Sequence, residues 1–162
     1  MPKSPDTTNA GFTLIEILVV LVIIGTTLGF ALLAFGDFGS QRRVVMAAEQ
    51  FANYVKLAQQ EAIIETSTLG IAIGTYTYQL LRFQTRWESI PNKNIFMIKS
   101  FPKDAVVRLE QSTQRGQPQI IIHATGDITA FTLYFDSMKK NHIISVIGTP
   151  NGIISVKKGV EE

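Results

Sequence analysis

The carboxylate of Glu16 lies inside a long apolar segment near the start of the chain. Glu16 is the only charged residue between Asp6 and Asp37. A charged side chain at the centre of a membrane costs about 2.5–3.5 kcal/mol, and less near the interface, so such groups are rare and usually functional. Burial without a cationic partner would be expensive. Glu16 is therefore a candidate for ion pairing in an apolar environment.

The element that carries Glu16 is predicted to be a membrane-spanning helix. Twenty residues from Ile17 to Gly36 contain no charge, and at about 1.5 Å per residue they reach about 30 Å, the thickness of a bilayer's hydrocarbon core. A cleaved signal peptide, with Ala34-Phe35-Gly36 as its cleavage site, is one alternative, but its apolar region would usually be about 7–15 residues long. An ordinary single-span anchor is another, and it leaves Glu16 without a purpose.

The residues around Glu16 resemble the processing signature of type IV prepilins and type II secretion pseudopilins. The matching run is Gly11-Phe12-Thr13-Leu14-Ile15-Glu16-Ile17-Leu18-Val19-Val20. The resemblance implies that a prepilin peptidase cuts after Gly11 and N-methylates Phe12, the new N-terminus. It also implies that the apolar helix stays in the bacterial inner membrane as a single pass, with the C-terminal body in the periplasm. The new ammonium group of one subunit could then neutralise Glu16 of its neighbour during assembly.

A second helical pattern follows Ser40. Apolar residues alternate at spacings of four and three, which places them on one stripe of a helix that must pack against a partner surface. The stripe consists of Val44, Ala48, Phe51, Val55, Ala58 and Ala62. The opposite face is expected to meet solvent, and it carries Arg42, Arg43, Glu49, Gln50, Lys56, Gln59, Gln60 and Glu61.

Beyond Thr66 the pattern changes to short β-rich runs separated by turn formers. Strands are expected at Leu69–Ile73, Tyr76–Phe83, Ala105–Leu109, Gln119–His123, Phe131–Phe135, Ile143–Ile147 and Ile153–Lys157, with one further short strand near Ile95–Ile98 inside a long connection from Trp87 to Asp104. Gly74-Thr75 and Thr149-Pro150-Asn151-Gly152 are expected to close hairpins.

These patterns predict an α+β, pilin-like fold. A long N-terminal helix, membrane-spanning in its first half, packs on an antiparallel β-sheet body, for which a two-sheet sandwich is one arrangement. The expected divisions are a cleaved leader at 1–11, a transmembrane helix at 12–39, an amphipathic periplasmic helix at 40–66 and a β-rich body at 67–162.

Within the family, the β body is most similar to the minor pseudopilin of the H type. The runs that carry this likeness are Ile120 to Gly126, Phe131-Thr132-Leu133 and Gly152-Ile153-Ile154-Ser155-Val156. The resemblance implies a structural subunit at or near the tip of a periplasmic pseudopilus that helps to export folded proteins across the outer membrane. Its implied partners are prepilin peptidase, major and minor pseudopilins and inner-membrane lipid, with secreted substrate and the outer-membrane secretin as further candidates. A type IV minor pilin for fibre assembly, DNA uptake or adhesion remains the alternative.

The sequence does not contain the patterns of common catalytic or metal sites. His123 ends one expected strand and His142 directly precedes another, without a nucleophile motif or metal-ligand spacing, and there is no cysteine. We therefore expect no enzyme activity, cofactor or metal. A formal net charge of +2 and the isolated pairs Lys139-Lys140 and Lys157-Lys158 argue against nucleic acid as the main partner.

Overall fold

The computed structural model describes residues 12–90, 96–110, 117–138, 141 and 143–159, and only the backbone of residues 33–38. The chain divides into two compact units, residues 1–38 and residues 39–162. One α-helix, α1, is assigned from Leu14 to Ile64 and contributes residues to both units. The expected leader at 1–11, including Gly11, lies outside the described residues.

The described part of the first unit is the apolar portion of α1. The segment from Leu14 to Leu32 is long and apolar enough to cross a membrane, and none of it is buried against protein. Two polar side chains within this segment are satisfied by the helix itself. The hydroxyls of Thr26 and Thr27 donate to backbone carbonyls one turn earlier, including that of Ile23 at 3.0 and 2.8 Å. Such bonds allow threonine to lie in an environment that offers no water.

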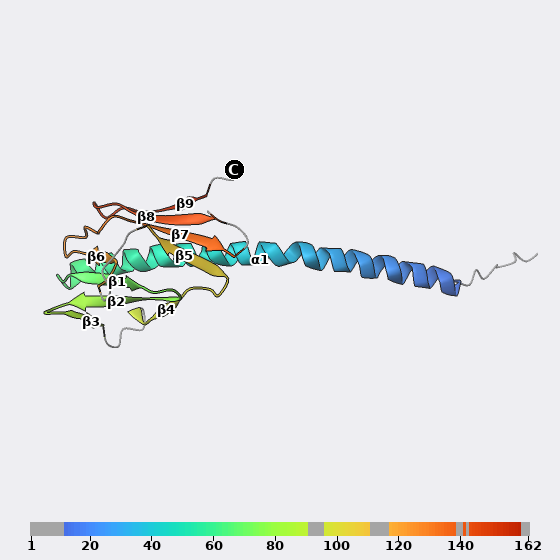
Figure 1. Ribbon diagram of the computed structural model, residues 1–162, viewed down its shortest axis with the longest axis horizontal. Coiled ribbons are helices and arrows are strands. Elements are labelled where there is room, and N and C mark those ends of the chain that lie inside the picture. The colour runs from blue at the N-terminus through green and yellow to red at the C-terminus, as the bar shows by residue number, and fades with distance from the viewer. Residues whose placement is uncertain (1–11, 91–95, 111–116, 139–140, 142, 160–162) are drawn as a thin grey trace, which may run out of the picture. The chain divides into compact units, whose positions relative to one another are not determined.

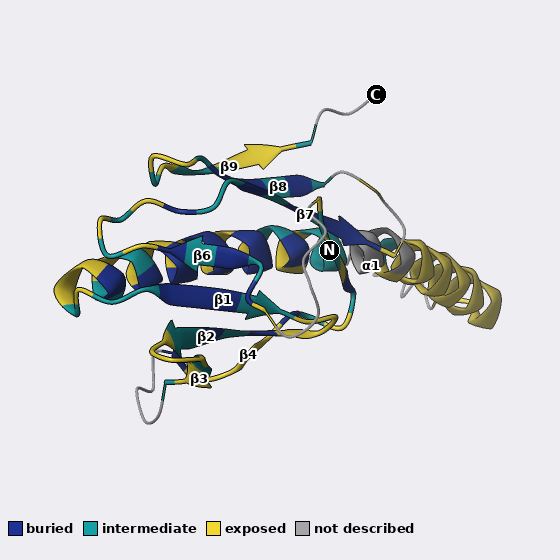
Figure 2. Cartoon of the chain, turned by 60° about the vertical axis from the view of Figure 1, so that its left-hand side comes forward, coloured by how far each residue is buried: buried dark blue, intermediate teal, exposed yellow. Residues whose placement is uncertain are grey.

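In the second unit, α1 buries the apolar stripe predicted from the sequence. All six stripe residues, Val44, Ala48, Phe51, Val55, Ala58 and Ala62, have no exposed surface. Ala47, Ala52 and Tyr54 widen the buried face, and Figure 2 shows this face directed toward the strands while the opposite side is exposed. α1 ends at Ile64, and Thr66 turns the chain with a φ of 47° while the amide of Ser67 donates to the carbonyl of Ala62.

The described strands form two antiparallel sheets, one on each side of this part of the helix (Figure 1). The first has the order β3-β2-β1-β6, with β4 also paired to β2, and its strands are β1 (Leu69–Ile73), β2 (Thr77–Phe83), β3 (Trp87–Ser89), β4 (Lys99–Ser100) and β6 (Ile120–Ile122). The second has the order β5-β7-β8-β9, and its strands are β5 (Ala105–Leu109), β7 (Phe131–Ser137), β8 (Ile144–Gly148) and β9 (Ile154–Lys158).

Phe51 of α1 connects the two sheets through the core. Its ring lies 5.2 Å from Tyr78 of β2 in the first sheet, and 6.3 and 6.0 Å from Phe131 and Phe135 of β7 in the second. Aromatic rings at these separations pack edge to face or tilted and stabilise a core beyond simple burial. The α+β class and the division of the strands into two sheets are therefore confirmed.

Most expected strands are present, but the segment from Trp87 to Asp104 differs. The strand expected near Ile95–Ile98 is wrong for its described part, because Phe96 has a 3₁₀ conformation, Met97 lies in a bend and the next strand begins at Lys99. The ring of Phe96 is buried against Tyr54 instead, at 5.9 Å. β3 was not predicted, since two of its three residues are exposed and polar and leave no alternating pattern.

Candidate functional site

The candidate site begins at the first turn of α1. Phe12 and Thr13 precede the helix, and the amides of Glu16 and Ile17 both donate to the carbonyl of Thr13, at 3.1 and 3.4 Å. Glu16 therefore lies in the first turn, where the helix dipole favours a negative charge. The side chain of Glu16 is exposed, and so are its neighbours.

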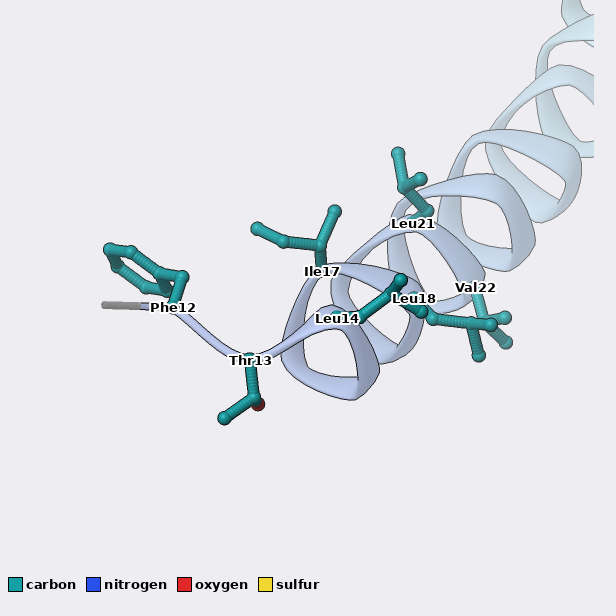
Figure 3. A pocket seen from close by; sticks show the side chains of 7 residues that line it. All are labelled: Phe12, Thr13, Leu14, Ile17, Leu18, Leu21 and Val22. Carbon is teal, nitrogen blue, oxygen red and sulfur yellow. The ribbon is translucent and has the colours of Figure 1, made fainter. Parts of the chain in front are cut away.

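The apolar side chains around Glu16 have no partner within the described part of the chain. Phe12 and Leu14 are 79% and 84% exposed. Figure 3 shows Phe12, Leu14, Ile17, Leu18, Leu21 and Val22 projecting from this end of the helix. An apolar surface of this length is not stable in water, so lipid or other helices must cover it. A charged group at its start is costly in such surroundings when it has no cationic partner.

Gly25 and Gly29 lie one turn apart on the apolar helix. A Cβ atom added at either position would meet no atom within 4 Å, so the fold of this chain does not itself require glycine there. Small residues at this spacing allow two helices to approach closely in a membrane. This spacing of small residues is a signal for helix contact that can be recognised in the sequence itself.

Two of the ion pairs in the described body join segments that the sequence did not connect. Arg43, at the start of the body's helix, donates to the carboxylate of Asp104 at 2.9 and 2.6 Å, which holds the pKa of that carboxyl below its ordinary value. Arg108 of β5 donates to Asp136 of β7 at 3.1 and 2.8 Å, and Asp136 is almost fully buried. Both pairs join segments distant in sequence, so spacing alone could not reveal them.

One residue assigned to the solvent face of the helix has another role. Gln59 is partly buried, and its side-chain amide donates to the carbonyls of Gly126 and Gly152. The expectation that it only meets solvent is therefore wrong, because two turns of the β body close over it.

The described residues contain no cluster of three or more His, Asp or Glu side chains that could hold a metal ion. His123 is exposed, directly after β6. His142 and the pair Lys139-Lys140 lie outside the described residues. Lys157 and Lys158 are exposed at the end of β9.

Comparison with protein families decides between the classes that share this fold. Residues 7–32 match the prokaryotic N-terminal methylation motif, and residues 47–152 match the type II transport protein GspH. The chain belongs to the GspH family. Members of this family are structural pseudopilin subunits of the secretion machinery and not enzymes, which agrees with the prediction from the sequence.

Known relatives agree with this assignment over most of their length. The chain is 28% identical over 140 residues to the type II secretion system protein H of Pseudomonas aeruginosa, covering 77% of this chain and 81% of the relative. It is 26% identical over 133 residues to the protein of the same name from Escherichia coli, covering 76% and 78%. The predicted resemblance to an H-type minor pseudopilin is confirmed.

Solved structures share the fold. The minor pseudopilin EpsH of Vibrio cholerae has a TM-score of 0.66 at 18% identity, covering 75% of this chain and 98% of that structure. The type IV minor pilin FimU of Pseudomonas aeruginosa has a TM-score of 0.57 at 14% identity, covering 74% and 92%. At such identities the likeness concerns the fold alone, so FimU does not outweigh the family match.

Proposed function

We propose that this chain works as a minor pseudopilin at or near the tip of a type II secretion pseudopilus, where it helps to export folded proteins across the outer membrane. The observation that carries this proposal is the combination of two matches on one chain, the methylation motif over the apolar helix and the GspH family over the body. The two-sheet body and the uncovered apolar helix fit a subunit that is anchored first and assembled later.

Maturation is proposed to follow the route of the family. Prepilin peptidase cuts between Gly11 and Phe12, and the amine of Phe12 is methylated. The described chain supports this position because Phe12 and Thr13 precede the first helical residue, Leu14, and Phe12 is largely exposed to an approaching enzyme. Cleavage there removes the polar leader and leaves an amine four residues before Glu16.

Glu16 is proposed to direct assembly. Its carboxylate lies among apolar side chains that need lipid or helices around them, and an unpaired charge in such surroundings is costly. The N-terminal amine of an adjacent processed pseudopilin is a cation of the right kind, supplied at the same depth. Assembly with other major and minor pseudopilins would thus pair two charges that are each unfavourable alone.

The segment 14–32 is proposed to anchor the chain in the inner membrane, with the body of residues 39–162 in the periplasm. In this orientation the body can contact other pseudopilins, exported substrate and the outer-membrane secretin. The apolar length of the segment supports the anchor. The orientation is taken from the family's processing route, in which prepilin peptidase cuts the leader on the cytoplasmic side.

Processing and assembly can be tested together in cells that secrete through this system. N-terminal sequencing of the mature chain should begin at Phe12, and Gly11→Ala should leave the leader attached. Because the chain has no cysteine, a single cysteine placed at an exposed body position can report disulfide crosslinks to cysteine-bearing pseudopilins. Crosslinks with secretion pseudopilins support the proposal. A mature chain starting at Asp37, or crosslinks only to subunits of a type IV pilus, would reject it.

A further inference from the structure

One end of the body gathers cationic side chains from three separate segments. Its residues come from the start of the body's helix, the loop before β5 and the end of β9, and we call them the basic rim: Arg42, Arg43, Lys103, Lys157 and Lys158. Arg42 and Lys158 are 116 residues apart in the sequence, so only the fold brings these positions to one end of the body.

Hydrogen bonds and strand register establish this grouping. Arg43 binds Asp104, which directly follows Lys103. Ala105 of β5 pairs with Ser137 at the end of β7. Phe135 of β7 pairs with Ile144 of β8, which pairs in turn with Lys158 of β9. The starts of β5 and β8 and the ends of β7 and β9 therefore lie at the same end of the body as Arg43 of α1, and Figure 1 shows these four strands side by side.

Among the residues that the structure describes, the rim has an excess of positive charge. Its described acidic neighbours are Asp104, which Arg43 neutralises, and Asp136, which Arg108 of β5 neutralises. Arg42, Lys103, Lys157 and Lys158 are exposed. Met138, 79% exposed, adds a flexible apolar side chain to a shallow hollow that it lines with Arg43, Pro102, Lys103 and Asp104. Cations around an exposed apolar side chain match the chemistry of a lipid headgroup layer.

The covalent chain limits how far this end can be from the membrane. The apolar segment ends at Leu32, and the body begins seven residues later at Gly39. Seven residues span at most about 25 Å when fully extended. The opposite end of the body, with the turns at Gly126 and Gly152, has no such tether.

We propose that the basic rim is a docking surface for anionic phospholipid headgroups, which holds the body against the membrane from which its helix emerges. The proposal rests on the anchoring of residues 14–32 put forward above. Because exposed charges are screened over about 8 Å at physiological salt, the contact weakens as ionic strength rises. The body of such a subunit can leave the membrane surface while its apolar helix stays in the membrane.

The absence of cysteine in the chain makes a direct test possible. The full chain with Met138→Cys is labelled with a fluorophore and reconstituted into vesicles that carry a headgroup-attached quencher. The vesicles are either phosphatidylcholine alone or phosphatidylcholine mixed with phosphatidylglycerol. A second chain with Gln60→Cys, an exposed position near the far end of the helix, serves as the matched probe.

Quenching at position 138 should be stronger in the anionic vesicles, should fall at high salt and should be lost with Lys103→Glu, Lys157→Glu and Lys158→Glu combined. Lys56→Glu, an exposed charge reversal outside the rim, should retain it. Equal quenching in both lipid mixtures, or quenching that the triple variant leaves unchanged, would overturn the proposal. Flotation of the same samples tests the anchor separately, because a chain that fails to float with vesicles contradicts the proposed anchoring and not the rim.

Discussion

Gln59 of α1 donates its side-chain amide to the carbonyl of Gly152, at 2.9 Å, in the turn between β8 and β9. The same nitrogen donates to the carbonyl of Gly126 at 3.0 Å, in the turn that follows β6. One amide group carries two N–H donors, and here each donor closes a different turn onto the helix. Two connections distant in sequence are thereby fixed to a single helical residue.

Replacement of Gln59 by alanine should lower the free energy of unfolding by about 1–3 kcal/mol, because two partly buried carbonyls lose their donor. Denaturant unfolding of the detergent-solubilised chain, followed by the single tryptophan Trp87, measures this change. Gln60→Ala, at the exposed neighbouring position, should change stability by less than about 0.5 kcal/mol. Equal effects at positions 59 and 60 would show that the two bonds contribute nothing.

Gly152→Ala should also destabilise the body, by about 1–3 kcal/mol for the backbone strain and by more with the steric clash. Gly152 has a φ of +81°, and a Cβ there would lie 2.6 Å from the carbonyl oxygen of Gly126. Gly74, in the turn between β1 and β2, has no positive φ, and its nearest would-be contact is 3.4 Å. Gly74→Ala should therefore be the milder change in a thermal melt, and the reverse order would contradict this account.

The sequence predicted those parts of the fold that have a local periodic signal. The helix stripe from Val44 to Ala62 repeats regularly, and β1 and β5 were predicted with the bounds that the structure shows. β3 was not predicted because its short, mostly exposed sequence leaves no alternating pattern. The role of Gln59 was not predicted because both of its acceptors come from distant segments. Gly11, Phe12 and Glu16 were identified by a contiguous motif, and their roles stay predictions.

The pair formed by Arg108 and Asp136 should contribute more to stability than the surface pair formed by Arg86 and Glu88. Asp136 is only 2% exposed, whereas the side chains of Arg86 and Glu88 are 84% and 46% exposed. Arg108→Ala removes a charged donor from a buried carboxylate and should cost about 1–3 kcal/mol, while an exposed pair is worth at most about 1 kcal/mol. Urea unfolding of Arg108→Ala beside Arg86→Ala makes the comparison, and similar midpoints for the two variants would refute it.

The body should lose stability in alkaline solution because of Tyr54. Burial, and then the neighbouring Tyr78, raise the pKa of the Tyr54 hydroxyl above its ordinary value of 10.0. The unfolded chain then loses this proton first as the pH rises, so the stabilising contribution is complete below about pH 10 and is lost above it. The free energy of unfolding, measured from about pH 8 to about pH 11 so that the range brackets the ordinary tyrosine pKa, should decline as the pH rises. The Tyr54→Phe variant should show a less steep decline. An unchanged slope would exclude Tyr54 as the cause.

Glu16→Gln should leave the chain processed and membrane-bound but should hinder its incorporation into the pseudopilus. The substitution keeps the shape of the side chain, removes its charge and leaves the apolar surface around it intact. An amide cannot neutralise an ammonium group, so the N-terminal amine of a neighbouring pseudopilin would enter the apolar environment without its counter-charge. N-terminal sequencing, membrane flotation and crosslinking to other pseudopilins separate these three steps.

Glu49→Gln, an equal loss of charge at an exposed position of the body, is the matched control and should assemble normally. Glu16→Asp tests the geometry of the pair, because it retains the charge on a side chain one methylene shorter and should restore part of the crosslinking lost in Glu16→Gln. If Glu16→Gln is incorporated as well as the unaltered chain, the carboxylate is not an assembly group. If the leader is retained instead, Glu16 acts in processing, and the ion-pair role is wrong.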